Sequence, residues 1–143
     1  MDKHVSQKYL TQQIMSASPA KLVAMLYDRA ISLLTDAIGG IEAGDTERRW
    51  RANQKATEVI CHLWETLDME RGGEVAVNLN QLYGFMLKRL LVVDIENNAA
   101  AAREVIRLLE PLRRSWHDMA KAEAAETSPA ADAAIPTQIS LSA

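Results

Sequence analysis

Four stretches of this 143-residue chain carry apolar side chains at alternating steps of three and four residues. That spacing places them on one face of an α-helix. The stripes are Leu22, Leu26, Ala30, Leu33, Ala37 and Ile41; Ala52, Ala56, Val59 and Leu63; Val75, Leu79, Leu82, Met86 and Leu90; and Ala102, Val105, Leu109, Leu112, Trp116 and Met119. The repeat predicts four amphipathic helices.

Short breaks with capping residues separate the stripes. Ser18 before Pro19 is typical of a helix start, because serine accepts a hydrogen bond from a free backbone amide and proline needs no donor there. Gly44 favours a left-handed helix end, and Asp45 is a good N-cap for the next helix. The later breaks lie at Gly72-Gly73, before Glu74, and at Asn97-Asn98. Each connection is therefore a tight turn.

Helices joined by such short turns run antiparallel, because a few residues cannot carry the chain back along a long helix. We expect an all-α protein, an antiparallel up-down four-helix bundle over residues 18–122. An N-terminal cap segment, residues 1–17, is expected to pack on the bundle. Pro111 predicts a bend in the fourth helix but not its end, because the apolar repeat continues past it. Residues 123–143 are rich in Ala, Pro and Ser, which predicts a flexible, disordered tail.

Charge and composition limit the possible partners. The net charge is −3, so no overall positive field attracts nucleic acid or anionic lipid. The polar start, Met1 to Lys8, resembles no signal peptide, and no apolar run is long enough for membrane insertion. We expect a cytoplasmic protein.

Side chains that commonly do chemistry do not converge in this sequence. His4, His62 and His117 are scattered, and none forms the Glu-x-x-His motif of helical di-iron bundles. Cys61 and His62 are adjacent, so on a helix they point about 100° apart and do not suit a nucleophile and its base. We expect no enzyme activity, catalytic residue, cofactor or metal site.

Apolar side chains also lie outside the stripes, in excess of the roughly three positions in seven that a bundle core needs. This surplus includes Val23, Tyr27, Ile31, Leu34, Trp50, Trp64, Phe85, Leu87, Leu91 and Val92. It either widens the core or forms an exposed groove for an amphipathic partner helix. Composition alone does not decide between the two.

Short motifs follow in order from residue 9 to residue 122. The N-terminal motifs are Tyr9, Ser16-Ala17-Ser18-Pro19-Ala20-Lys21-Leu22 and Met25-Leu26-Tyr27-Asp28. Further motifs are Asn53-Gln54-Lys55-Ala56, Val59-Ile60, Gly72-Gly73-Glu74, Asn78-Leu79, Leu82-Tyr83, Met86, Arg89-Leu90, Leu112-Arg113 and Trp116. In this order and spacing they resemble the FliS family of flagellar secretion chaperones.

The resemblance implies a bundle that binds the C-terminal segment of flagellin, prevents its premature polymerisation and assists its delivery to the flagellar type III export apparatus. The export gate and flagellar regulatory proteins are further candidate partners. The resemblance also implies that the N-terminal stretch folds over the binding groove, with Tyr9 and Ile14 at the matching positions. We interpret these two residues as a displaceable plug.

The partner-binding residues expected in the bundle are mainly apolar groups outside the stripes. They are Tyr27, Ile60, Trp64, Tyr83 and Leu87, with Asn53 and Arg89 as polar orienting residues. The repeat does not say which of two adjacent apolar faces turns outward.

Two alternatives remain open from the sequence. In a histidine phosphotransfer bundle His62 would accept the phosphoryl group, although Leu63-Trp64-Glu65 does not match the small and basic residues expected after it. In a clientless oligomeric bundle the surplus apolar residues would be buried between identical subunits. For the chaperone itself we expect a monomer or a weak homodimer.

Overall fold

The structure is a computed structural model that describes residues 3–127 of the chain. Five α-helices follow one another along these residues, with no β-strand among them. They are α1 (Lys3–Ser16), α2 (Pro19–Glu42), α3 (Thr46–Glu65), α4 (Gly73–Glu96) and α5 (Ala99–Thr127). The predicted all-α class is confirmed. In this part of the chain, no helix combines the length and the apolar character needed to cross a membrane.

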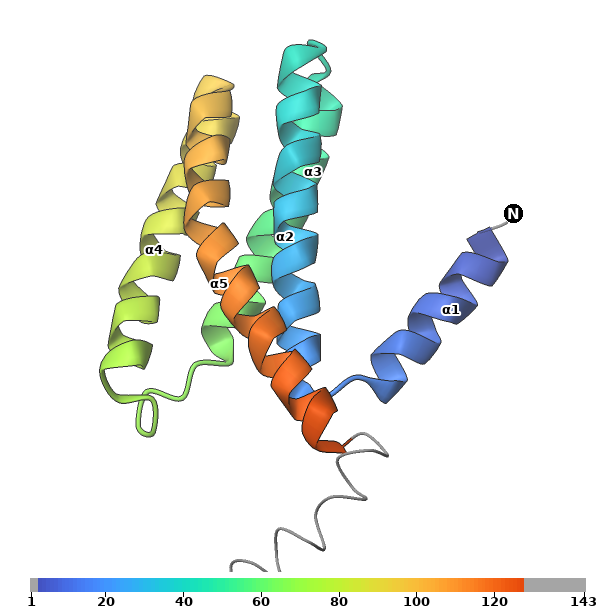
Figure 1. The fold of residues 1–143 in the computed structure, drawn as a ribbon. Helices are drawn as coiled ribbons and strands as arrows, with labels where there is room; N and C mark the ends of the chain where they lie inside the picture. Colours follow the sequence, from blue (N-terminus) through green and yellow to red (C-terminus); the bar gives the residue numbers. More distant parts are fainter. Residues whose placement is uncertain (1–2, 128–143) are drawn as a thin grey trace, which may run out of the picture. The chain divides into compact units, whose positions relative to one another are not determined.

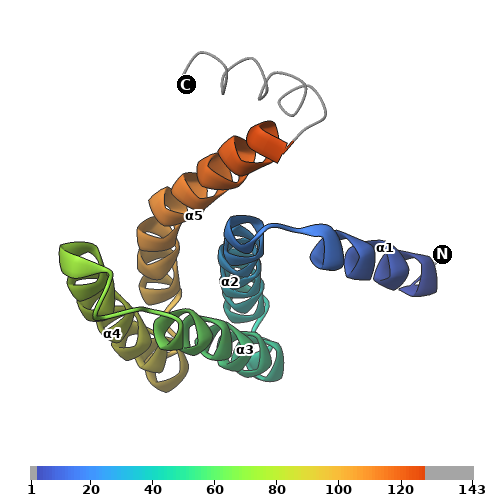
Figure 2. The same cartoon turned by 90° about the horizontal axis from the view of Figure 1, so that it is seen from below.

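Residues 25–113 form one compact unit, which holds most of α2, all of α3 and α4, and α5 as far as Arg113. Within this unit the four helices form an antiparallel bundle, in which α3 lies beside α4 and α5 lies beside α2 (Figures 1 and 2). The predicted four-helix bundle is therefore confirmed. The described residues before Met25 and after Arg113 belong to a second unit.

The helix ends follow the capping residues of the sequence. Ser18, Asp45 and Asn98 each accept a hydrogen bond from the backbone N–H three residues ahead, at 3.1, 3.0 and 3.0 Å. Gly44 after α2 and Asn97 after α4 both adopt left-handed backbone, with φ of 70° and 54°. These local signals mark the starts of α2, α3 and α5 and the ends of α2 and α4.

Burial follows the predicted stripe closely in α3 and less closely in α2. All four stripe residues of α3 are buried. In α2 the stripe residues Ala30 and Ala37 are buried, but Tyr27 and Leu34 are buried in place of Leu26 and Leu33, which stay partly exposed. In α4, Val75 is exposed although it belongs to the predicted stripe. Both α2 and α4 carry apolar residues on two neighbouring faces of the same helix. The apolar repeat therefore assigned some exposed residues to the buried face.

Alanine makes up much of the core of residues 25–113. The buried alanines are Ala30, Ala37, Ala52, Ala56, Ala76, Ala101 and Ala102. Small side chains let neighbouring helix axes approach closely, since interaxial distance depends on side-chain size at the contact. A core of this kind has little room for further large side chains, so part of the apolar surplus remains at the surface.

The fourth bundle helix is longer than expected. As predicted, Pro111 does not end it, because α5 is helical from Ala99 to Thr127 with Pro111 inside. Residues 123–127, assigned to the tail from the sequence, continue this helix. The remaining tail, residues 128–143, lies outside the described residues.

Candidate partner-binding site

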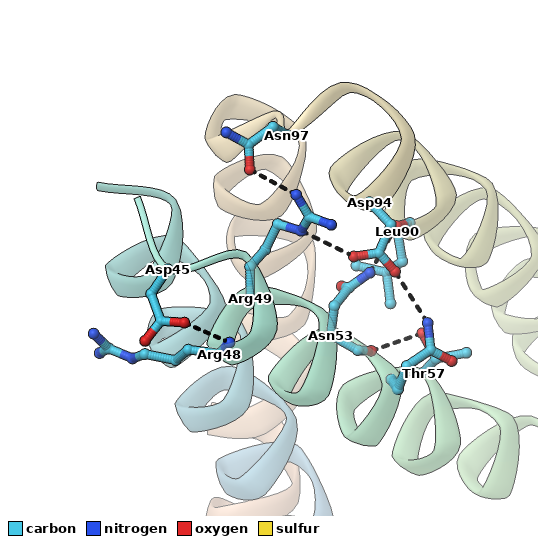
Figure 3. A network of polar contacts seen from close by, with 9 residues as sticks. Asp45, Arg48, Arg49, Asn53, Thr57, Leu90, Asp94 and Asn97 are labelled. Carbon is cyan, nitrogen blue, oxygen red and sulfur yellow. Dashed lines mark hydrogen bonds and ion pairs between the residues drawn. The ribbon is translucent and has the colours of Figure 1, made fainter. Parts of the chain in front are cut away.

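A polar network joins α3 to α4 at the end of the pair where α3 begins (Figure 3). Arg49 Nε lies 3.3 Å from Asp94 Oδ1, and the two side chains are only 11% and 19% exposed. The Arg49 guanidinium also donates a 2.8 Å hydrogen bond to Asn97 Oδ1. Gln54 Nε2 donates to the other oxygen of Asp94 at 3.0 Å. The charges of Arg49 and Asp94 are therefore paired at a position where both side chains are nearly buried.

Asn53 adds a second link between the same helices. Its side chain is buried, and its Nδ2 donates a 2.8 Å hydrogen bond to the backbone carbonyl of Leu90 (Figure 3). An unpaired polar group at such a position costs about 1–3 kcal/mol. A slip of α4 by one turn would break this bond and the Arg49–Asp94 pair together, so the network fixes the register of the two helices.

At the other end of the pair, Trp64 is fixed against α4. Its indole Nε1 donates a 2.6 Å hydrogen bond to Asn80 Oδ1. A Cβ placed on Gly84 would lie 3.4 Å from the indole ring, so the ring passes close over the glycine. Trp64 is thus a partly exposed aromatic group held in one position by two residues of α4.

Two rows of side chains border the junction of α3 and α4 on its outer side. The outer α3 row is Trp50, Gln54, Thr57, Cys61 and Trp64, and the outer α4 row is Asn80, Gly84, Leu87, Leu91 and Asp94. Every member is partly or well exposed. Hydrogen bonds toward both ends, between Trp64 and Asn80 and between Gln54 and Asp94, bring the rows together. We call the two rows the α3–α4 surface.

Large apolar side chains are exposed to solvent on the α3–α4 surface and elsewhere on α4. Trp50 is 54% exposed, Leu91 62% and Ile95 79%, and Val77 and Phe85 of α4 are also exposed. The helix α4 is apolar on more than one face, because Met86, Leu90 and Val93 on its inner side are buried as well. Exposed apolar groups in a neighbouring set are typical of a surface that binds another protein.

Two of the predicted contact residues form a buried pair across the bundle. Tyr27 of α2 and Tyr83 of α4 are buried, and their hydroxyl groups are hydrogen-bonded to each other. Burial raises the pKa of Tyr83 above its ordinary value, and the hydrogen bond between Tyr83 and Tyr27 opposes this only in part. Tyr83 therefore stays uncharged at neutral pH, and the pair links helices inside the core.

The other predicted contacts in the bundle differ in their access to solvent. Ile60 and Asn53 are buried in this chain, whereas Trp64 and Leu87 are partly exposed. Arg89 is directed to α5, where its Nε lies 3.2 Å from Glu104 Oε1. Of the set, only Trp64 and Leu87 lie on the α3–α4 surface.

The N-terminal residues are described only in part. Tyr9, on α1, is 66% exposed, and Met15 on the same helix is exposed too. The side chain of Ile14 lies outside the described residues. The predicted packing of this segment on the bundle stays a prediction.

Leu91, Ile95 and Trp50 are not among the contact residues predicted from the sequence. Trp50 and Leu91 did appear among the surplus apolar residues. For Leu91 and Ile95 the signal that could have placed them is that α4 carries apolar residues on more than one face, which implies that one apolar face has no partner within the bundle. This signal does not place Trp50, which lies on α3.

Among residues 3–127, the structure contains no cluster of three or more His, Cys, Asp or Glu side chains placed to hold a metal ion. Cys61 is a free thiol within the outer α3 row, and His62 next to it is exposed. The features that stand out are thus a register-fixing network and an apolar surface, which suit binding of a polypeptide.

The Arg49–Asp94 pair can be tested with a double-mutant cycle. We expect R49M and D94L each to lower the free energy of unfolding by about 3 kcal/mol, because each leaves a nearly buried charge unpaired. The double variant should lose about 2 kcal/mol less than the sum of the two. Urea unfolding measures all three.

The control cycle uses Arg48 and Asp36, an ion pair at 2.8 Å whose side chains are 43% and 50% exposed. R48M and D36L should show coupling below about 1 kcal/mol. Equal coupling in the two cycles would contradict a special role of the buried pair.

Known proteins include relatives of this chain. Residues 1–123 match the family described as "Flagellar protein FliS". The flagellar secretion chaperone FliS of Salmonella typhimurium is 40% identical over 115 residues, which are 80% of this chain and 85% of the relative. FliSB of Pseudomonas aeruginosa, also a flagellar secretion chaperone, is 32% identical over 114 residues, 80% of this chain and 90% of the relative.

A solved structure of a bacterial flagellar chaperone has the same fold. It superimposes with a TM-score of 0.67 at 15% sequence identity, over 85% of this chain and 99% of the other. At this identity the likeness concerns the fold alone, and the family assignment comes from the sequence matches. The chain therefore belongs to the FliS family of flagellar secretion chaperones, which are not enzymes.

Proposed function

We propose that this chaperone binds the C-terminal segment of flagellin in the cytoplasm, prevents its premature polymerisation and assists its delivery to the flagellar type III export apparatus. The observation that carries the proposal is the exposed apolar character of the α3–α4 surface, on which Trp50 and Leu91 are more than half exposed, with the exposed Ile95 next to Asp94 of the outer α4 row. Membership of the flagellar secretion chaperone family supports the same role.

The physical reason is the chemistry of an unassembled coiled-coil segment. Before assembly such a segment exposes an apolar helical stripe, which other copies would bind. A chaperone that covers the stripe removes it from water and blocks those contacts. When the apolar stripe packs against two apolar helices of the chaperone, the segment is bound by the helix-in-groove type of recognition.

Within the contact set predicted from sequence, Trp64 and Leu87 are the residues we propose to touch flagellin. Tyr27, Asn53, Ile60 and Tyr83 are buried in the free chain, so direct contact with them would require the helices to part. We propose that these residues support the shape of the surface, and that Arg89 acts by holding α4 against α5 through Glu104.

The family assignment favours this role over the two alternatives. Neither relative named above is a phosphotransfer protein, and both are secretion chaperones. Burial of the apolar surplus between identical subunits would compete with client binding, so we keep the expectation of a monomer or weak homodimer. The export gate and flagellar regulatory proteins remain candidate partners.

The proposal is tested by co-purification with flagellin from the same cells. We expect full-length flagellin to co-purify with the chaperone and flagellin without its C-terminal segment to be lost, because the apolar stripe is then absent. Flagellin lacking an equal length at its N-terminus is the matched control and should still bind. Binding that survives removal of the C-terminal segment would contradict the proposal.

The N-terminal segment offers a second test. We propose that it shields the binding surface when flagellin is absent, with Tyr9 and Ile14 as the plug. Tyr9 and Met15 are large apolar side chains exposed on α1, and covering apolar area is favourable by about 25 cal/mol per Å². Deletion of residues 1–15 should therefore leave the bundle folded and tighten flagellin binding.

Circular dichroism and titration with labelled flagellin measure the two effects of the deletion. The variant Y9A should reproduce part of the gain, whereas K8A, which alters an exposed residue of the same helix, should not. Unchanged or weaker flagellin affinity after the deletion would rule out the plug.

A further inference from the structure

A pocket of about 680 Å³ lies where the start of α2 and the last turns of α5 come together. Both helices and the connection between α1 and α2 form its wall, and its lining residues include Ala17, Pro19, Lys21, Ala120 and Ala124. All of them belong to the unit that holds residues 1–24 and 114–143. A pocket of this size has room for several side chains, since ligand pockets commonly measure about 300–1,000 Å³. We call it the α2–α5 pocket.

Small apolar side chains leave this pocket open. Ala120 and Ala124 are four positions apart on α5, so they share one face of that helix, and Pro19 lines the pocket from α2. Charged lining residues of both signs are present, namely Lys21, Lys121, Glu123 and Glu126. Because these charges balance, the pocket suits an apolar group better than an ion of either sign.

The part of the chain that follows the described residues starts beside this pocket. Glu126 is a lining residue, and the structure describes the chain as far as Thr127, the next residue. Residues 128–143 contain a single charged side chain, Asp132, and three large aliphatic ones, Ile135, Ile139 and Leu141. A segment with so little charge loses few favourable contacts with water when its aliphatic side chains enter a pocket.

The tail is long enough to return along α5. The lining residues of α5 run from His117 to Glu126, which is about 14 Å at the helical rise per residue. Ile135 is nine positions after Glu126, and an extended chain of that length spans about 30 Å. Pro129 favours the change of direction that this path needs, because a proline disfavours helix for the residue before it. The aliphatic residues can therefore reach every part of the pocket.

We infer that the α2–α5 pocket binds the chain's own C-terminal tail through Ile135, Ile139 and Leu141. Tethering favours this occupant over a separate ligand, because a short linker gives an effective concentration in the millimolar range. The docked tail also contacts Ala17 and Ser18, which connect α1 to α2, so it links the C-terminal tail to the N-terminal segment. The inference concerns the free chaperone and does not depend on which protein it binds.

Paramagnetic relaxation enhancement in the full-length chain tests the contact. A nitroxide label is attached at S142C in a C61S background, so that the tail carries the only thiol. We expect the amide signals of Ala17 and Lys21, which line the pocket, to be broadened. The signal of Glu42, at the opposite end of α2 and about 30 Å from Lys21 along the helix, should stay sharp.

Removal of the aliphatic side chains should release the tail. In I135S/I139S/L141S with the same label, the broadening at Ala17 and Lys21 should be largely lost, because serine gains little from leaving water. The matched control T137S/Q138N/S140T changes three polar residues of the same segment and should keep the broadening.

Filling the pocket should displace the tail as well. Ala124 is an exposed lining residue of α5, so A124W places a large side chain in the pocket without changing the core. We expect this variant to lose most of the broadening at Lys21. The circular dichroism of the labelled variants should match that of the parent chain, since none of the substitutions alters a buried residue.

Three results would overturn the inference. The first is a labelled chain without broadening at Ala17 and Lys21, and the second is equal broadening in the serine variant and in its control. The third is broadening that survives A124W, which would place the tail elsewhere. None of these results concerns the α3–α4 surface, so each would reject the docking of the tail and leave the proposed function standing.

Discussion

Arg49 and Asp94 meet where both side chains have lost most of their contact with water, and the register of α3 against α4 depends on that pair. A charge in such a place is costly unless it is paired and hydrogen-bonded. Asn97 and Gln54 supply the additional hydrogen bonds, and Asn53 holds the carbonyl of Leu90 nearby. Sliding either helix would leave several of these groups unsatisfied at once, so one alignment is strongly preferred.

The fixed register has a consequence on the outer side of the same two helices. It holds Trp64 beside Asn80 and Gln54 beside Asp94, so that two rows with matching spacing lie next to each other. The inner side of α4 is filled by Met86, Leu90 and Val93, and Leu91 and Ile95 of the same helix stay exposed. Gln81 and Lys88, exposed on the same helix, interrupt this apolar face with polar groups. The surface is therefore a product of how the core is built.

Much of the fold could be predicted from sequence, because its signals are local. The caps at Ser18 and Asp45 and the stripe of α3 depend on residues a few positions apart, and the structure confirms them. The outward face of α4 was harder, since a helix with apolar residues on more than one face has no preferred side until its neighbours are known. Likewise the Tyr27–Tyr83 pair joins residues 56 positions apart, which no periodicity reveals. Among the contact residues predicted from the sequence, Trp64 and Leu87 are partly exposed on the α3–α4 surface, and their contact with a partner stays a prediction.

Site-specific photo-cross-linking tests most directly whether the client lies on the α3–α4 surface. A photoreactive phenylalanine analogue would replace Leu91, which is exposed in the outer α4 row, or Arg107, which is exposed on α5 as a control. After illumination with full-length flagellin, we expect a cross-link from position 91 to the C-terminal segment and little from position 107. Efficient cross-linking from position 107 with none from position 91 would contradict this expectation.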